Sequence, residues 1–178
     1  MPASILARPA ITDYAPYYDN YIKHVPAGDL VAFAESQIHE LRALLAGVTE
    51  AQSRFRYAPD KWSLREVIGH LIDPERVFSY RATAFSRGDA GALPSFDQAA
   101  WAPMGAYDDR GLDELLDEWE TVRRATVALM RYMPEAALHR RGIASTVDFT
   151  VLALLFISPG HVGYHLDLLQ RDYLDALQ

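Results

Sequence analysis

The chain has 178 residues, of which 50% are apolar and 23% are charged, and these values are typical of a soluble globular domain with a sizeable core. Its formal net charge of -7 argues against a broad surface for phosphates or nucleic acid. Cysteine is absent, which excludes disulfides, thiolate nucleophiles and thiolate metal ligands, so any bound metal must be held by nitrogen and oxygen.

The sequence also gives no sign of a membrane protein. The longest uninterrupted apolar run, residues 151–157, is much shorter than the roughly 20 residues that a membrane-spanning helix needs. The N-terminus has no basic residues followed by an apolar stretch, so we expect no secretory signal peptide. These features predict a cytoplasmic protein that does not bind membranes.

Residues 1–28 are predicted to form an N-terminal arm that packs on the domain. Several prolines argue against a long helix here, whereas several tyrosines argue against plain disorder. The prolines are Pro2, Pro9, Pro16 and Pro26, and the tyrosines are Tyr14, Tyr17, Tyr18 and Tyr21. The remainder of the chain, residues 29–178, is expected to form one helical domain.

Apolar residues at helical spacing predict a first helix from about residue 30 to residue 50, with Asp29 as its N-cap. A second helix is expected after Ser63. This residue can form a capping box with Glu66, in which each side chain satisfies a backbone N–H at the start of the helix.

The second helix is expected to end near Gly88, and a long loop, residues 92–110, follows it. Long loops in compact domains are often functional. The sequence then predicts a third helix over residues 111–133, a short extended piece at 143–149, and a fourth helix from a cap at Thr150 to about residue 173. Four long amphipathic helices with connections of unequal length predict an all-α helical bundle.

Three histidines are candidate ligands of one metal ion. His161 and His165 are four residues apart, so they share one face of the fourth helix. This pair alone is equally compatible with one buried histidine bonded to a backbone carbonyl and one exposed histidine. His70 lies on the inner stripe of the second helix, and a metal shared by three imidazoles would satisfy the lone pair of each. The other histidines are expected to be solvated: His24, His39 and His139.

Two carboxylates are candidates for a catalytic role. Asp73 follows His70 by three residues, which suits a fourth ligand or an acceptor for an imidazole N–H. Asp97 lies in the long loop. The other charged residues near Asp73 are expected to form exposed or interhelical ion pairs: Glu75, Arg76 and Arg81.

Two prolines fall inside the helical patterns. Pro74 and Pro159 each lack a backbone hydrogen-bond donor and favour a kink. Our hypothesis is that both helices bend at these residues and widen the mouth of the bundle. The alternative is that each helix ends and restarts.

Three segments of the chain carry recognisable motifs: residues 61–73 with 75–78 in the second helix, residues 93–98 in the loop, and residues 160–166 in the fourth helix. They resemble, in the same order, the second helix, the loop and the fourth-helix motif of the DinB-like (YfiT-like) superfamily of metalloenzymes. The resemblance spans about residues 30–173, and the ordered set of motifs is more specific than any one of them.

This resemblance implies an up-down-down-up four-helix bundle of the DinB/YfiT type, often found as a homodimer. It also implies a divalent metal ion, often zinc or nickel, bound by His70, His161 and His165. Characterised relatives include transferases that attach low-molecular-weight thiols such as bacillithiol to electrophiles, and mycothiol-dependent isomerases. The chain departs from the family pattern at its two helical prolines and at Tyr164, where close relatives often have another histidine.

The leading hypothesis is a metal-dependent enzyme with a small-molecule substrate, in which the metal lowers the pKa of a low-molecular-weight thiol that is then transferred. Metal-dependent hydrolysis would use the same ligands. The reacting group would be a metal-bound water or thiolate, with Asp73 and Asp97 as candidate catalytic residues.

Two alternatives remain open at this point. One is a non-catalytic stress-response or ligand-binding protein with a structural metal, and the other is a bundle whose histidines only pack. An open coordination position facing a cavity favours the enzyme, whereas a metal closed by four protein ligands favours the binding protein.

Overall fold

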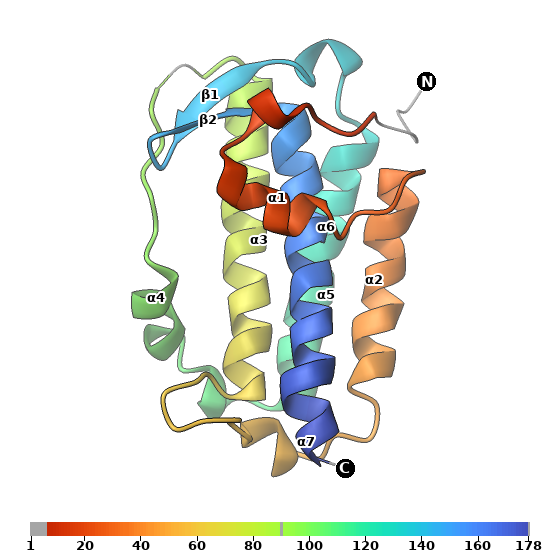
Figure 1. Ribbon diagram of the computed structural model, residues 1–178, viewed down its shortest axis with the longest axis vertical. Helices are drawn as coiled ribbons and strands as arrows, with labels where there is room; N and C mark the ends of the chain where they lie inside the picture. The colour runs from red at the N-terminus through yellow and green to blue at the C-terminus, as the bar shows by residue number, and fades with distance from the viewer. Residues whose placement is uncertain (1–6, 90, 178) are drawn as a thin grey trace.

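The computed structural model describes residues 7–89 and 91–177 and shows a four-helix bundle (Figure 1). Its long helices are α2 (Leu30–Leu44), α3 (Leu64–Ser86), α5 (Leu112–Arg131) and α6 (Val151–Leu168). In Figure 1, α2 and α6 run in one direction and α3 and α5 in the other. The predicted all-α bundle with up-down-down-up connectivity is therefore confirmed.

Shorter elements connect and extend these helices. The short helices are α1 (Asp19–Ile22), α4 (Gln98–Met104) and α7 (Asp175–Leu177), and a π-helical turn, Leu169–Leu174, joins α6 to α7. An antiparallel hairpin, β1 (Arg141–Ala144) and β2 (Val147–Thr150), lies at one end of the bundle (Figure 1). The predicted extended piece, residues 143–149, therefore forms parts of two short strands with a turn at Ser145 and Thr146 between them. Single 3₁₀ turns are Ile11–Asp13, Pro16–Tyr18, Gln52–Arg54, Tyr107–Asp109 and Glu135–Ala137.

The predicted helix caps are present. Asp29 accepts hydrogen bonds from two backbone N–H groups in the first turn of α2. Ser63 and Glu66 form the expected capping box at the start of α3, and the Thr150 hydroxyl accepts a hydrogen bond from a backbone N–H in the first turn of α6. These side chains satisfy donors that a helix start leaves without partners, so they set where each helix begins.

One predicted helix boundary and one predicted loop are wrong. Helix α2 ends at Leu44 and not near residue 50, because the chain turns through Gly47, whose φ of 88° is readily adopted only by glycine. The predicted long loop, residues 92–110, contains helix α4 and a 3₁₀ turn. Pro103 lies inside this short helix, where a proline ordinarily argues against helix.

Both long helices that contain a proline continue through it. Pro74 lies within α3 and Pro159 within α6, so the alternative that each helix ends and restarts is wrong. Figure 1 shows both ribbons running the length of the bundle without a break or a sharp bend. The predicted widening of the bundle by kinked helices is therefore not seen.

The interior consists of two apolar clusters with a polar layer between them. One cluster fills the end of the bundle near the hairpin, and the other fills the opposite end. The layer between them is made of four buried side chains, one from each long helix: Gln37, Glu75, Arg123 and Ser158. A layer of this kind restricts how the helices can slide past one another, because each polar atom must keep its partner.

Hydrogen bonds join the four residues of the polar layer. Glu75 Oε2 accepts from Arg123 Nη2 at 2.9 Å and from the Ser158 hydroxyl at 2.8 Å. Gln37 accepts from Arg123 Nη1 at 3.1 Å and donates to the carbonyl oxygen of Pro159 at 2.9 Å. The network therefore ends two residues before His161.

The helix α6 and its continuation, Val151–Leu177, are long and apolar enough by length and composition to cross a membrane. However, 78% of the apolar window is buried inside the bundle. A helix that is apolar on all sides is explained here by its packing against α3 and α2 and by the cover of the N-terminal helix α1.

The N-terminal arm crosses α6, as Figure 1 shows for α1. Tyr21 and Ile22 are buried there. A Cβ atom on Gly160 would lie 2.4 Å from the carbonyl oxygen of Tyr21, so only glycine at this position of α6 allows the arm to come this close. The first six residues of the predicted arm lie outside the described residues.

Candidate metal centre

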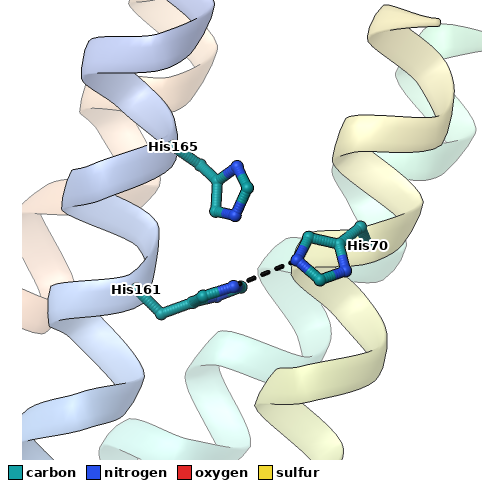
Figure 2. A group of neighbouring side chains, drawn as sticks. All are labelled: His70, His161 and His165. Carbon is teal, nitrogen blue, oxygen red and sulfur yellow. Dashed lines mark hydrogen bonds between the residues drawn. The ribbon is translucent and has the colours of Figure 1, made fainter. Parts of the chain in front are cut away.

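Three histidine rings meet in the interior of the bundle. His70 comes from α3, and His161 and His165 come from α6; Figure 2 shows the three side chains extending into the space between these two helices. One ring nitrogen from each histidine can be chosen so that all three lie within 4.8 Å of one another. The three side chains are at most 7% exposed.

The spacing of two of these nitrogens already suits a metal ion. Nε2 of His70 lies 3.1 Å from Nε2 of His161. Two nitrogens bound at about 2.0–2.1 Å to one tetrahedral or octahedral ion would be about 2.8–3.4 Å apart. Three neutral imidazoles with no thiolate also form a donor set that zinc, nickel and related divalent ions accept.

Burial keeps the three rings uncharged. It lowers the pKa of His70 to about 4, and burial together with the neighbouring His70 lowers the pKa of His165 to about 3. Burial, followed by His165 and His70, holds the pKa of His161 well below the usual value. At neutral pH each ring is therefore neutral and keeps a lone pair on one nitrogen, which a metal ligand requires.

These lowered pKa values predict that the metal-free protein loses stability as the pH falls below 6.5. The unfolded chain takes up protons on these histidines near pH 6.5, whereas in the folded protein His70 takes up a proton only near pH 4 and His165 only near pH 3. For His70 alone the loss at pH 5 is roughly 2 kcal/mol. Urea denaturation at pH 7.5 and pH 5 measures it.

The matched comparison for this prediction is a His165→Leu variant. Its loss of stability between pH 7.5 and pH 5 should be smaller than that of the wild type by roughly 2 kcal/mol, because one group with a lowered pKa is gone. Equal losses in the two proteins would contradict the assignment of the pH dependence to these rings.

One ring nitrogen of His165 has no hydrogen bond. Nδ1 of this ring is buried and lacks a partner among the described residues. The ring is held by edge-to-face contacts instead, with its centre 4.5 Å from that of His161 and 5.2 Å from that of Tyr164. Packing therefore orients this histidine.

Neither candidate carboxylate joins the three histidines. Asp73 accepts a hydrogen bond from the Tyr107 hydroxyl, and Asp97 accepts two from backbone N–H groups as the N-cap of α4. Within residues 7–89 and 91–177, the group of potential ligand atoms contains only the three imidazoles. Asp73 does line a narrow crevice together with His70.

The other histidines lie away from this group. His39 and His139 are exposed, as predicted. His24 is half-buried, and its Nδ1 lies 3.2 Å from the carboxylate of Asp167, so the solvated interpretation is wrong for this residue. The packing of the arm against α6 places it there.

Two cavities reach the histidine cluster from different directions. The His165 cavity has a volume of about 240 Å³ and also reaches His70. Its lining includes the aromatic residues Tyr17, Tyr21, Tyr57, Trp62, Tyr164 and Tyr173 and the charged residues Asp60 and Lys61. The His161 cavity has a volume of about 250 Å³. Its lining is Tyr17, Tyr18, Tyr21, Pro74, Phe78, Ser95, Phe96, Gln98, Ser145 and His161.

The N-terminal arm separates these cavities. Tyr17 and Tyr21 line both of them, as does Gln98 at the start of α4. The two tyrosine hydroxyls lie 2.9 Å apart, and the Tyr21 ring is 5.1 Å from the His161 ring. The sequence pattern predicted that the arm packs on the domain but not that its tyrosines line the site. Their spacing of four residues was the available signal, since it places both on one helical face.

Comparison with known proteins gives a family and a fold. The sequence profile described as the DinB superfamily matches residues 33–169. No curated protein matches the chain in sequence. Among solved structures, the chain is similar to YfiT from Bacillus subtilis, described as a probable metal-dependent hydrolase with an unusual four-helix bundle topology. The two are 18% identical, with a TM-score of 0.70 over 94% of this chain and 96% of that chain, a likeness that shows the fold.

Proposed function

Because the chain belongs to the DinB superfamily, we propose that it is a metal-dependent enzyme in which His70, His161 and His165 bind a divalent cation. The observation that carries the proposal is the meeting of three buried, uncharged imidazoles beside two cavities. Three protein ligands leave at least one coordination position for a water molecule or a substrate atom. Zinc and nickel are the ions that we propose.

We favour transfer of a low-molecular-weight thiol as the reaction. A transfer joins two organic molecules, and the presence of two separate cavities supports two binding sites. A bound divalent cation would lower the pKa of the thiol. The thiol comes from outside the chain, since the chain contains no cysteine.

The residues of the chain would position the two reactants. The aromatic side chains of the His165 cavity can pack against an apolar or planar molecule. Burial raises the pKa of Tyr21, so its hydroxyl stays protonated at neutral pH and can donate a hydrogen bond at the boundary of the two cavities.

Hydrolysis is the second candidate, and the description of YfiT as a probable metal-dependent hydrolase favours it. Such a reaction would need only one organic substrate, and the same three ligands would serve a metal-bound water. The non-catalytic alternative is a binding protein with a structural metal.

The test compares three assays on protein loaded with zinc or nickel. The first mixes bacillithiol or cysteine with 1-chloro-2,4-dinitrobenzene, the second offers 4-nitrophenyl acetate and water, and the third repeats both with His161→Ala. We expect thiol conjugation by the loaded wild type, and a loss of more than about 100-fold in the variant. Ester hydrolysis without conjugation would favour the second candidate, and equal rates in wild type and variant would contradict a metal-dependent reaction.

A further inference from the structure

Arg81 is a buried cation without a carboxylate partner. Its side chain is 1% exposed, and it forms no ion pair in the part of the chain that the structure describes. The other two fully buried arginines each pair with a carboxylate: Arg65 with Glu50, and Arg123 with Glu75. The prediction that Arg81 forms an ion pair is therefore wrong, and its charge is unbalanced.

The hydrogen bonds of Arg81 leave part of its guanidinium group unused. Nη2 donates to the carbonyl oxygen of Pro94 and to the Ser145 hydroxyl, each at 2.8 Å. Nη1 is buried and has no partner among the described residues. Because an arginine stays protonated in proteins, a buried guanidinium group of this kind favours an anion beside it.

This unbalanced charge lies directly behind the wall of the His161 cavity. Ser145, which accepts a hydrogen bond from Arg81, lines that cavity. Phe96 lines it too, with its ring centre 5.8 Å from the guanidinium carbon of Arg81. Tyr18 is a third lining residue near Arg81. Burial raises the pKa of its hydroxyl, and the nearby charge of Arg81 partly offsets this effect.

The turn that carries Ser145 is held in an uncommon conformation. Ser145 and Thr146 have φ values of 53° and 63°, in the left-handed region that β-branched residues such as threonine rarely adopt. Leu93 holds the hairpin in place, because its backbone N–H donates to Ile143 and its carbonyl oxygen accepts from Ser145. Positive φ at both central residues is what a two-residue hairpin turn requires, so the turn itself accounts for this conformation and places the Ser145 hydroxyl beside Arg81.

We infer that the His161 cavity binds a small organic carboxylate, with its carboxylate group paired to Arg81 and its carbon skeleton extending toward His161. By displacing the Ser145 hydroxyl, the carboxylate would accept from Nη2 and from the unused Nη1 together, the two-point geometry in which arginine binds carboxylates best. The aromatic side chains of Tyr17, Tyr18 and Phe96 would pack against a planar skeleton. The inference rests on the proposed function only for the claim that this carboxylate is a reactant.

The experiment measures binding to the metal-free protein, so that its outcome is independent of whether the histidines bind a metal. The probes are 4-fluorobenzoate and its uncharged analogue 4-fluorobenzamide, each titrated into the protein and followed by ¹⁹F NMR. We expect the wild type to bind the acid at least about tenfold more tightly than the amide, since a buried charge pair is what distinguishes them. In Arg81→Gln the two affinities should become equal within about twofold.

Two further variants make the test specific. Arg76→Gln removes a half-exposed arginine of the same helix, which pairs with Glu118, and should keep the preference for the acid. Ser95→Phe places a large side chain at an exposed residue that lines the cavity, and leaves Arg81 in place. It should weaken binding of the acid at least about tenfold. This variant keeps the test decisive if Arg81→Gln does not fold. Absence of binding in the wild type, equal affinities for acid and amide, or a preference that persists in Arg81→Gln would each overturn the inference.

Discussion

Replacing His165 by alanine is expected to remove most of the metal from the purified protein. The imidazole of His165 is one of only three ligand side chains that meet at the site among the described residues. Even a residue that only supports a metal ligand contributes about 10- to 100-fold to affinity, so loss of a ligand should cost more than about 100-fold. Elemental analysis of protein purified without added metal, followed by competition with a chelator, measures this loss.

The matched control for this experiment is His39→Ala. His39 is exposed on α2, outside the group of three histidines, so its removal should leave the metal content at the wild-type value. The same metal content in His165→Ala and in the wild type would show that the ring is not a ligand. A wild type that carries no metal and binds none on addition would support the interpretation that the histidines only pack.

Replacing Glu75 by alanine is expected to lower the free energy of unfolding by about 3–5 kcal/mol. The side chains of Glu75 and Arg123 are 1% and 0% exposed, so the change leaves the guanidinium group buried without its carboxylate. The Ser158 hydroxyl loses its acceptor as well. Urea denaturation measures the change.

Two other proteins separate the ion pair from its surroundings. Arg124→Ala removes an exposed arginine that pairs with Glu120 one turn away, and should cost about 0.3–0.5 kcal/mol. The double variant Glu75→Leu with Arg123→Met should be more stable than Glu75→Ala, because it leaves no buried charge without a partner. A loss below about 1 kcal/mol in Glu75→Ala would show that this pair does not hold the polar layer together.

The polar layer connects stability with the proposed site. Gln37 accepts a hydrogen bond from Arg123 and donates one to the carbonyl oxygen of Pro159 in α6. Pro159 in turn precedes His161 by two residues. The network therefore fixes the position of α6 along the bundle axis relative to α2, α3 and α5. This position brings the histidine rings of α6 opposite His70.

Features that depend on neighbours along the chain were predicted from sequence. The caps at Asp29, Ser63 and Thr150 are hydrogen bonds that span two or three residues, so the local sequence contains both partners. The common face of His161 and His165 follows from the period of the α-helix alone. Placing His70 opposite them needed only its position on the inner stripe of another helix.

Which charged residues are buried, and what each of them pairs with, was not predicted from sequence. Glu75, Arg76 and Arg81 lie within one stretch of α3 and have the same polar character in the sequence. Glu75 pairs with a buried arginine, Arg76 pairs with a partly exposed glutamate, and Arg81 pairs with no carboxylate among the described residues. Which of them is buried depends on where α5, the hairpin and residues 93–96 meet α3. Those contacts involve residues far along the chain.

The sequence by itself therefore determined the helices, most of their starts and the three histidines that share the interior. Only the tertiary structure decided that Tyr17 and Tyr21 divide the space around those histidines into two cavities, and that Arg81 lies uncompensated behind one of them. The physical reason is that helix formation and capping are local, whereas a cavity and the balance of buried charge are properties of how several helices pack together.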